Sequence, residues 1–452
     1  MSAAIRLAEF AIKTRLEDCP TEALARVRLA ALDSLGVMLA GASEAVARIV
    51  REIARTEGGA PLATVVGTSM RTSPTWAALA NGAAGHAHDF DDTSFALMGH
   101  PSVPLLAAAL AAGEAACVDG ATIAVAYVAG FEVDGAIGTA VNPAHYTRGW
   151  HNTATIGTLG CAATAARVLA LDVPRAATAI AIAASLASGV KENFGSMTKP
   201  YHAGHAARNG VLAALLAREG MTATATALEG KQGWLGAAGG VGTLEASLAT
   251  LGAQWHLLTS GVAVKPYPSC AMTHAAIDAL LDLRETHRLQ AADVEAVEVG
   301  VNHVTPDVLA YPAPATPLQR KFSMQFCAAA ALAEGRVDMS SFDDRAPGRD
   351  VAALMPRVRM VVDGALPDRL EQHAWSRVSV RLRDGRVLAS PPRGAKGHPD
   401  QPLSYEALRA KFMGCAAALP REEAEGVADM LQHLEDIPDV RALTSRLVGD
   451  VD

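Results

Sequence analysis

Residues 81–102 have the sequence NGAAGHAHDFDDTSFALMGHPS, and this stretch is the most informative part of the chain. It places histidines, aspartates and a threonine between two Ala-rich segments, TWAALA at 75–80 and VPLLAAALAAG at 103–113. The apolar flanks predict buried helices. Burying titratable groups beside a core costs desolvation free energy unless they are paired. Clusters of such groups are therefore candidate sites for proton transfer. The stretch therefore predicts helices packed around a polar site.

Several uses of these polar residues are open. If residues 87–94 are helical or form a tight turn, Asp89 and Thr93 lie one turn apart on one face. Asp91 is expected to cap a helix or form a turn. An alternative is a metal site, because His86, His88 and Asp92 offer nitrogen and oxygen ligands at short spacing.

The length and patterning predict two domains. A chain of 452 residues, 50% of them hydrophobic, is longer than a domain with a single hydrophobic core usually is. Residues 1–265 read as successive, largely apolar helices, and residues 393–452 return to this helical domain. Residues 266–392 are expected to form a smaller α+β domain, since 294–301 and 377–383 alternate and Asp384-Gly385 predicts a hairpin turn. The predicted fold is mainly α with a smaller α+β domain.

Composition excludes some function classes. The formal charge of −8 disfavours nucleic-acid binding, which uses surplus Lys and Arg. The six cysteines are scattered and predict reduced thiols in a cytoplasmic protein. The N-terminus is not expected to be a signal peptide, and the apolar run 176–190 is too short to span a bilayer. GxGxxG, GxxxxGK[ST] and GxSxG are absent, so nothing favours a nucleotide cofactor or a serine nucleophile.

Three further stretches carry candidate residues. His151 follows Arg148-Gly-Trp and precedes a predicted helix. Lys199 lies in SMTKPYHAGH, where the following proline is expected to bias it away from helical geometry. Lys265, in VKPYPSC, adds a cation at the predicted domain junction, where clefts usually occur.

In this order, the stretches resemble the MmgE/PrpD family over nearly the whole chain. The matching pieces are GHAHDFDDT, GHPSVPLLAAAL, GWHNTATIGTLGCAATAARVLAL, SMTKPYHAGHAARNGVLAALLA, VKPYPSCAMTHAAIDAL, KFSMQF and GHPDQPLSYEALRAKF.

The resemblance implies a large all-helical domain built from both chain ends, an α+β lid and a homodimer. It also implies catalysis without a metal or organic cofactor. Activities of such proteins include 2-methylcitrate dehydratase, cis-aconitate decarboxylase and iminodisuccinate epimerase. All of them transfer a proton at a carbon next to a carboxylate, so the expected partner is a small di- or tricarboxylate, with no nucleic acid and no membrane.

The resemblance also implies site residues. The family's catalytic pattern matches Asp89, His100, His151 and Lys199, and its substrate-binding pattern matches Thr93, Lys199 and Lys265; Tyr311 is the candidate for a tyrosine contributed by the lid. The chain departs from the pattern after the threonine, where a Trp is replaced by Ser94 and Phe95. This departure weakens a decarboxylase assignment.

The mechanism expected from these matches uses His100 and His151 as the acid/base pair, with Asp89 orienting or charging one of them. The lysines hold the anionic substrate. Dehydration is the leading reaction, followed by epimerisation and then decarboxylation. A metal-dependent hydrolase and a catalytically silent polycarboxylate-binding protein are the alternatives from other classes.

Overall fold

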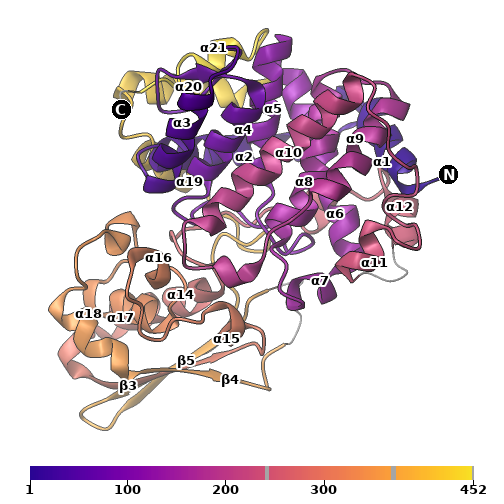
Figure 1. Cartoon of the computed structure of the whole chain (residues 1–452). Helices are drawn as coiled ribbons and strands as arrows, with labels where there is room; N and C mark the ends of the chain where they lie inside the picture. Colours follow the sequence, from indigo (N-terminus) through magenta and orange to yellow (C-terminus); the bar gives the residue numbers. More distant parts are fainter. Residues whose placement is uncertain (240–243, 368–372, 450–452) are drawn as a thin grey trace.

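The computed structural model describes residues 1–239, 244–367 and 373–449. It has a large helical body and a smaller α+β part beside it, and both chain ends lie in the helical body (Figure 1). This arrangement confirms the mainly α fold with a smaller α+β part. We call the part from α14 through β6 the small domain.

The helical body is built from both ends of the described chain. Its helices are α1 (Ala3–Lys13), α2 (Thr21–Gly41), α3 (Ala45–Glu57), α4 (Pro74–Gly85), α5 (Ser102–Ala116), α6 (Gly120–Val141), α7 (Ala144–Thr147), α8 (Asn152–Val168), α9 (Val173–Leu186), α10 (Thr198–Arg218), α11 (Trp234–Ala238), α12 (Leu244–Thr250), α13 (His256–Thr259), α19 (Tyr405–Cys415), α20 (Arg421–Gln432) and α21 (Arg441–Thr444). The body also holds a small antiparallel ribbon, β1 (Ala63–Thr64) with β2 (Arg71–Thr72), which the sequence patterns did not predict.

The centre of the body consists of helices that are apolar nearly all round. Helices α5, α6 and α8 are buried along almost their whole length, and α10 packs across α4 and α8. Helix α6 is long and apolar enough to cross a bilayer, but 89% of that window is buried inside the body. A core helix of a globular protein has the same properties.

Helix α6 continues through Gly130 to Val141. A Cβ atom on Gly130 would lie 2.0 Å from the Thr164 hydroxyl oxygen, so this glycine permits close packing against α8. The C-terminal tail packs back on the body, where Phe412 of α19 is buried against Gly36 of α2.

The small domain is a four-stranded sheet with helices packed on it (Figure 1). The strand order is β4-β3-β5-β6, with β3 parallel to β4 and antiparallel to β5. Its elements are α14 (His274–His287), β3 (Val294–Val301), α15 (Thr305–Val308), α16 (Pro317–Arg320), α17 (Met324–Glu334), α18 (Arg349–Leu354), β4 (Val358–Val362), β5 (Ser376–Leu382) and β6 (Val387–Arg393). Alternate residues of β3 and β5 face α14 and α17 and form a second core, as their alternating pattern predicts.

Lys199 differs from its sequence-based expectation. It lies in the first turn of α10, although Pro200 follows it. The proline is tolerated because the first N–H groups of a helix have no intrahelical partner, so its missing N–H is not needed.

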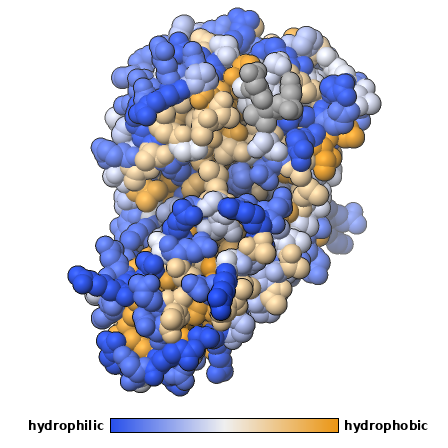
Figure 2. Space-filling model, turned by 90° about the vertical axis from the view of Figure 1, so that its left-hand side faces the viewer, coloured by the Kyte–Doolittle hydropathy of each residue, from blue (hydrophilic) through white to orange (hydrophobic). Residues whose placement is uncertain are grey.

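Hydrophobic residues form patches between hydrophilic ones on the surface drawn in Figure 2. Helix α3 buries Val46 and Val50 on one side, yet leaves Ile49 and Ile53 about half exposed on the other. The homodimer stays a prediction.

Glycines allow close packing of helices α4 and α10, of which the first precedes the candidate residue Asp89 and the second contains Lys199. A Cβ atom on Gly204 of α10 would lie 2.1 Å from the Leu79 carbonyl oxygen of α4. We therefore expect Gly204→Ala to destabilise the protein by about 1–3 kcal/mol through overpacking. Gly414→Ala in α19 is the control, because its Cβ would meet nothing within 4 Å and should stabilise by about 0.5–1 kcal/mol. Thermal unfolding of both variants is the measurement, and a Gly204→Ala protein as stable as its parent contradicts this packing.

Candidate active site

The site is built on the loop between α4 and α5. Within this loop Asp89 and Met98 both have a left-handed backbone, with φ of 51°. Aspartate tolerates this conformation better than most residues, but methionine adopts it rarely. Backbone strain of this kind persists only where the surroundings impose it.

Three lysines from distant parts of the chain hold the loop in place. Lys321 donates to the His88 carbonyl oxygen at 2.9 Å, Lys265 to that of Asp89 at 2.8 Å and Lys411 to that of Phe90 at 2.7 Å. We call this set the lysine clamp. Lys411 also pairs with buried Asp33 at 2.6 Å. The clamp fixes three successive peptide groups, and its members come from the small domain, the junction and the C-terminal tail.

Asp89 is the anionic centre of the site. Its Oδ1 accepts from Lys265 at 2.5 Å and from Lys199 at 3.1 Å, and all three side chains are buried. Burial alone would raise the pKa of Asp89, but the two ammonium groups hold this pKa well below its usual range. Burial lowers the pKa of Lys199 against the opposing effect of Asp89. Asp89 is therefore a carboxylate that keeps two cations inside a water-poor pocket.

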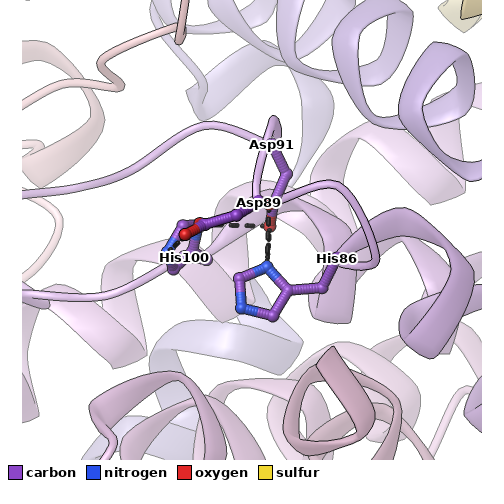
Figure 3. A group of neighbouring side chains, drawn as sticks. All are labelled: His86, Asp89, Asp91 and His100. Atoms are coloured by element: carbon purple, nitrogen blue, oxygen red, sulfur yellow. Dashed lines mark hydrogen bonds and ion pairs between the residues drawn. The ribbon is translucent and has the colours of Figure 1, made fainter. Parts of the chain in front are cut away.

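Asp91 lies between two imidazole rings (Figure 3). Its carboxylate oxygens lie 2.8 Å from Nδ1 of His86 and 3.2 Å from Nδ1 of His100. Burial would raise the pKa of Asp91, but the two histidines hold it well below its usual range. An ionised carboxylate accepts, so His86 carries its proton on Nδ1 when neutral, whereas Nδ1 of His100 lies at ion-pair distance from Asp91 but outside hydrogen-bond geometry.

The two rings then have different tasks. Nε2 of His86 accepts from Lys199 at 2.8 Å, and burial lowers the pKa of His86 to about 4. Nε2 of His100 lies 3.6 Å from Asp89 at the cavity. Burial, with Lys265 and Lys199, lowers the pKa of His100. His86 therefore orients Lys199, whereas Nε2 of His100 is available to a substrate.

His151 stands at the N-terminus of α8 on another side of the cavity. Its Nδ1 lies 3.0 Å from Nδ1 of His202, and its ring packs edge-on against Phe194 at 4.9 Å. Burial and the charge of Lys199 hold the pKa of His151 well below its usual range. One of the two facing nitrogens must carry the proton of this hydrogen bond, so the tautomers of His151 and His202 are coupled.

Asp89, His100, His151, Lys199 and Lys265 line one cavity, whose empty space is about 670 Å³ when the part open to solvent is included. Its lining combines polar and apolar residues from both parts of the protein. The lining residues are Asp89, Thr93, Ser94, Phe95, Met98, Gly99, His100, Tyr146, His151, Phe194, Lys199, Lys265, Cys270, Ala271, Met272, Phe322 and Ala374.

The structure brings most of the sequence-predicted residues together. The residues that line this single cavity are Asp89, Thr93, His100, His151, Lys199 and Lys265. Tyr311 is not among the lining residues; its hydroxyl donates to the Phe194 carbonyl oxygen at 2.6 Å, so it supports a residue of the wall. The chemical roles of all these residues stay predictions.

Sequence reasoning missed three residues. Asp91 was expected to cap a helix or form a turn, but it orients two histidines instead. His86 was considered only as a metal ligand, and His202 was passed over beside Lys199. The sequence does place Asp91 five residues after His86, just beyond the end of α4. Neither helical nor strand periodicity predicts a contact at that spacing.

The alternative metal set of His86, His88 and Asp92 does not come together in the structure. His88 turns away and contacts the Ala40 carbonyl oxygen at 3.3 Å, and Asp92 accepts from the Ser102 amide at 3.3 Å. A different group has ligand atoms within 4.8 Å of one another: His86, Asp89, Asp91 and His100. An ion there would have to displace Lys199 from His86 and Asp89.

The neighbouring residues Asp91 and Asp92 offer a matched test. Burial, followed by the charge of Asp33, raises the pKa of Asp92 well above its usual range, which favours the neutral form of this side chain. Asp92→Asn should therefore leave kcat close to that of the parent. Asp91→Asn removes the carboxylate that accepts from His86 and pairs with His100, and we expect kcat to fall by about 10²–10⁴-fold. Turnover measured by product NMR tests this pair, and equal effects of the two changes would contradict the assignment.

Comparisons with known proteins agree with the geometry. The family model described as MmgE/PrpD N-terminal domain matches residues 5–245, and that described as MmgE/PrpD C-terminal domain matches residues 267–436. Cis-aconitate decarboxylase of Mus musculus is 31% identical over 440 residues, covering 92% of this chain and 88% of that protein. The Homo sapiens protein of that name is 30% identical, with 92% and 89% covered. Cis-aconitate decarboxylase of Aspergillus terreus is 24% identical, with 95% and 93% covered. The chain therefore belongs to the MmgE/PrpD family.

Proposed function

We propose that this protein is a lyase that removes CO2 from a small unsaturated polycarboxylate of the cis-aconitate type. The observation that carries the proposal is the convergence of His100, His151, Lys199 and Lys265 on one largely buried cavity. The names of the relatives support decarboxylation. Dehydration, the leading reaction from the sequence, and epimerisation stay predictions, because the same residue types serve them.

The lysines supply the anion-binding groups. The hydrogen bonds described for Lys199 use two of its three N–H groups, to His86 and Asp89. Those of Lys265 use two as well, both to Asp89. Each ammonium therefore keeps one N–H for a substrate carboxylate. Preorganised cations in a water-poor site stabilise negative charge without rearranging during the reaction.

The chemical step moves one proton to carbon. The bond between the departing carboxylate and its methylene carbon breaks, and its electron pair forms a new double bond as CO2 leaves. The electrons of the original double bond move to the vinyl carbon beside another carboxylate, and that carbon takes a proton. A protonated histidine gives this proton and regains one from water.

His100 is the best-placed donor. Its Nδ1 lies 3.2 Å from Asp91 and its Nε2 lies 3.6 Å from Asp89, so an imidazolium would be paired with a carboxylate at each nitrogen. In the free protein, burial and the two lysines keep its pKa low. A bound carboxylate neutralises the lysines, so substrate binding raises the pKa of His100 and favours its protonated form in the complex. His151, on a different side of the cavity, is the candidate to orient or protonate the other end of the substrate.

Product analysis in heavy water tests the reaction. We expect cis-aconitate to release CO2 and yield a product with one deuterium at the carbon next to a carboxylate. His100→Ala should lower turnover at least about 100-fold. His433→Ala is the control, because this side chain is 75% exposed. If cis-aconitate is untouched while 2-methylcitrate loses water or iminodisuccinate inverts, the protein is a dehydratase or an epimerase instead.

The pH dependence tests the acid. Because the acid form is required, kcat should fall as pH rises through the pKa of His100 in the substrate complex. The free protein has the lower pKa, so the profile of kcat/KM should break at a lower pH than that of kcat. Initial rates over pH 5–9 measure both. A kcat that increases through this range would indicate a base and would contradict the assignment of His100 as proton donor.

A further inference from the structure

The cavity has an apolar wall that the proposed chemistry does not use. Phe95, Met98, Met272 and Phe322 are among its lining residues, and Nζ of Lys199 lies 5.2 Å from the centre of the Phe322 ring. Met98 comes from the loop of the helical body, whereas Met272 and Phe322 come from the side of the small domain. We call these four residues the apolar wall.

The wall still exposes apolar surface. Phe95, Met98 and Met272 are only partly buried, although Met98 and Met272 pack against the core of the small domain. Covering this surface with an apolar group would be favourable. The flexible, polarizable side chain of methionine suits a surface that adapts to such a group.

The backbone conformation of Met98 also supports a functional role for the apolar wall. A φ of 51° is rare for a residue other than glycine, asparagine or aspartate, and strain of this kind gathers at functional sites. Met98 lines the cavity close to Gly99 and His100. The strain therefore occurs where the wall meets the reacting groups.

The cations lining the cavity match two carboxylates. Lys199 and Lys265 are the cations among the lining residues, and Asp89 already pairs with both. No arginine occurs among the described residues that line it. A third carboxylate would therefore find no further lysine or arginine there, and an apolar group in its place avoids the cost of desolvating that charge.

The cavity therefore offers two cations beside an apolar surface. We propose that the preferred substrate carries an apolar substituent beside two carboxylates, and that the apolar wall binds this substituent. The inference rests on the proposed lyase function but concerns recognition alone.

Binding of unreactive probes tests the inference separately from catalysis. The probes are succinate, 2-methyl-, 2-propyl- and 2-pentylsuccinate, with propane-1,2,3-tricarboxylate as the compound that has a third carboxylate. Calorimetric titration should show Kd falling about fourfold with each added methylene until the wall is filled. The tricarboxylate should bind more weakly than 2-pentylsuccinate.

Variants assign the gain to the wall. Met272→Gln and Met98→Gln keep the length of the side chain but make it polar, so the ratio of Kd for succinate to Kd for 2-pentylsuccinate should fall toward one. Met221→Gln is the control, because Met221 is 51% exposed in a loop and does not line the cavity; it should keep the parent ratio.

A Kd independent of chain length, or tightest binding of the tricarboxylate, would overturn the inference. Turnover of cis-aconitate without a chain-length effect would refute the apolar substituent and leave the lyase intact. A chain-length effect in a protein that converts none of the acids offered would refute the lyase and leave the apolar wall intact.

Discussion

Three ammonium groups on three successive peptide carbonyls are the constraint on which the site depends. Lys321, Lys265 and Lys411 hold the carbonyl oxygens of residues 88, 89 and 90. Burial lowers the pKa of Lys321 to about 8. Its hydrogen bonds to backbone carbonyl oxygens offset part of the free energy of desolvating the ammonium group. Because these lysines come from different parts of the chain, the helical body, the small domain and the C-terminal tail must all dock before the loop takes its shape. The fold and the site are therefore formed together.

By fixing the loop, the lysine clamp places each buried charge of the site next to an oppositely charged or hydrogen-bonding partner. Asp89 is presented to Lys199 and Lys265, while Asp91 faces the two rings behind it. Each charge is paired before a substrate arrives, as buried ions require. A substrate carboxylate that joins the lysines changes this balance and, through it, the proton affinity of His100. Binding and acid catalysis are thus linked by electrostatics within a few ångströms.

Much of this could be predicted from the sequence, and the limits have physical causes. Helical periodicity and strand alternation depend on local spacing, so the mainly α fold and the strands near 294–301 and 377–383 were predicted. Propensity does not show that Thr164 packs against Gly130 inside a helix, because that contact joins two different helices. Asp91 and His86 were missed because the contact between them depends on the loop that contains the left-handed residue Asp89. His202 was missed because its partner, His151, lies 51 residues away in the sequence. Lys321 and Lys411 act on backbone carbonyls, which leave no sequence pattern.

The most direct test of the central claim is a crystal structure with bound 2-methylsuccinate. The account predicts a ligand carboxylate within hydrogen-bond distance of Nζ of both Lys199 and Lys265, with the carbonyl groups of residues 88–90 still held by the lysine clamp. A ligand bound away from these lysines, or a loop whose carbonyls have turned from the clamp on binding, would contradict it.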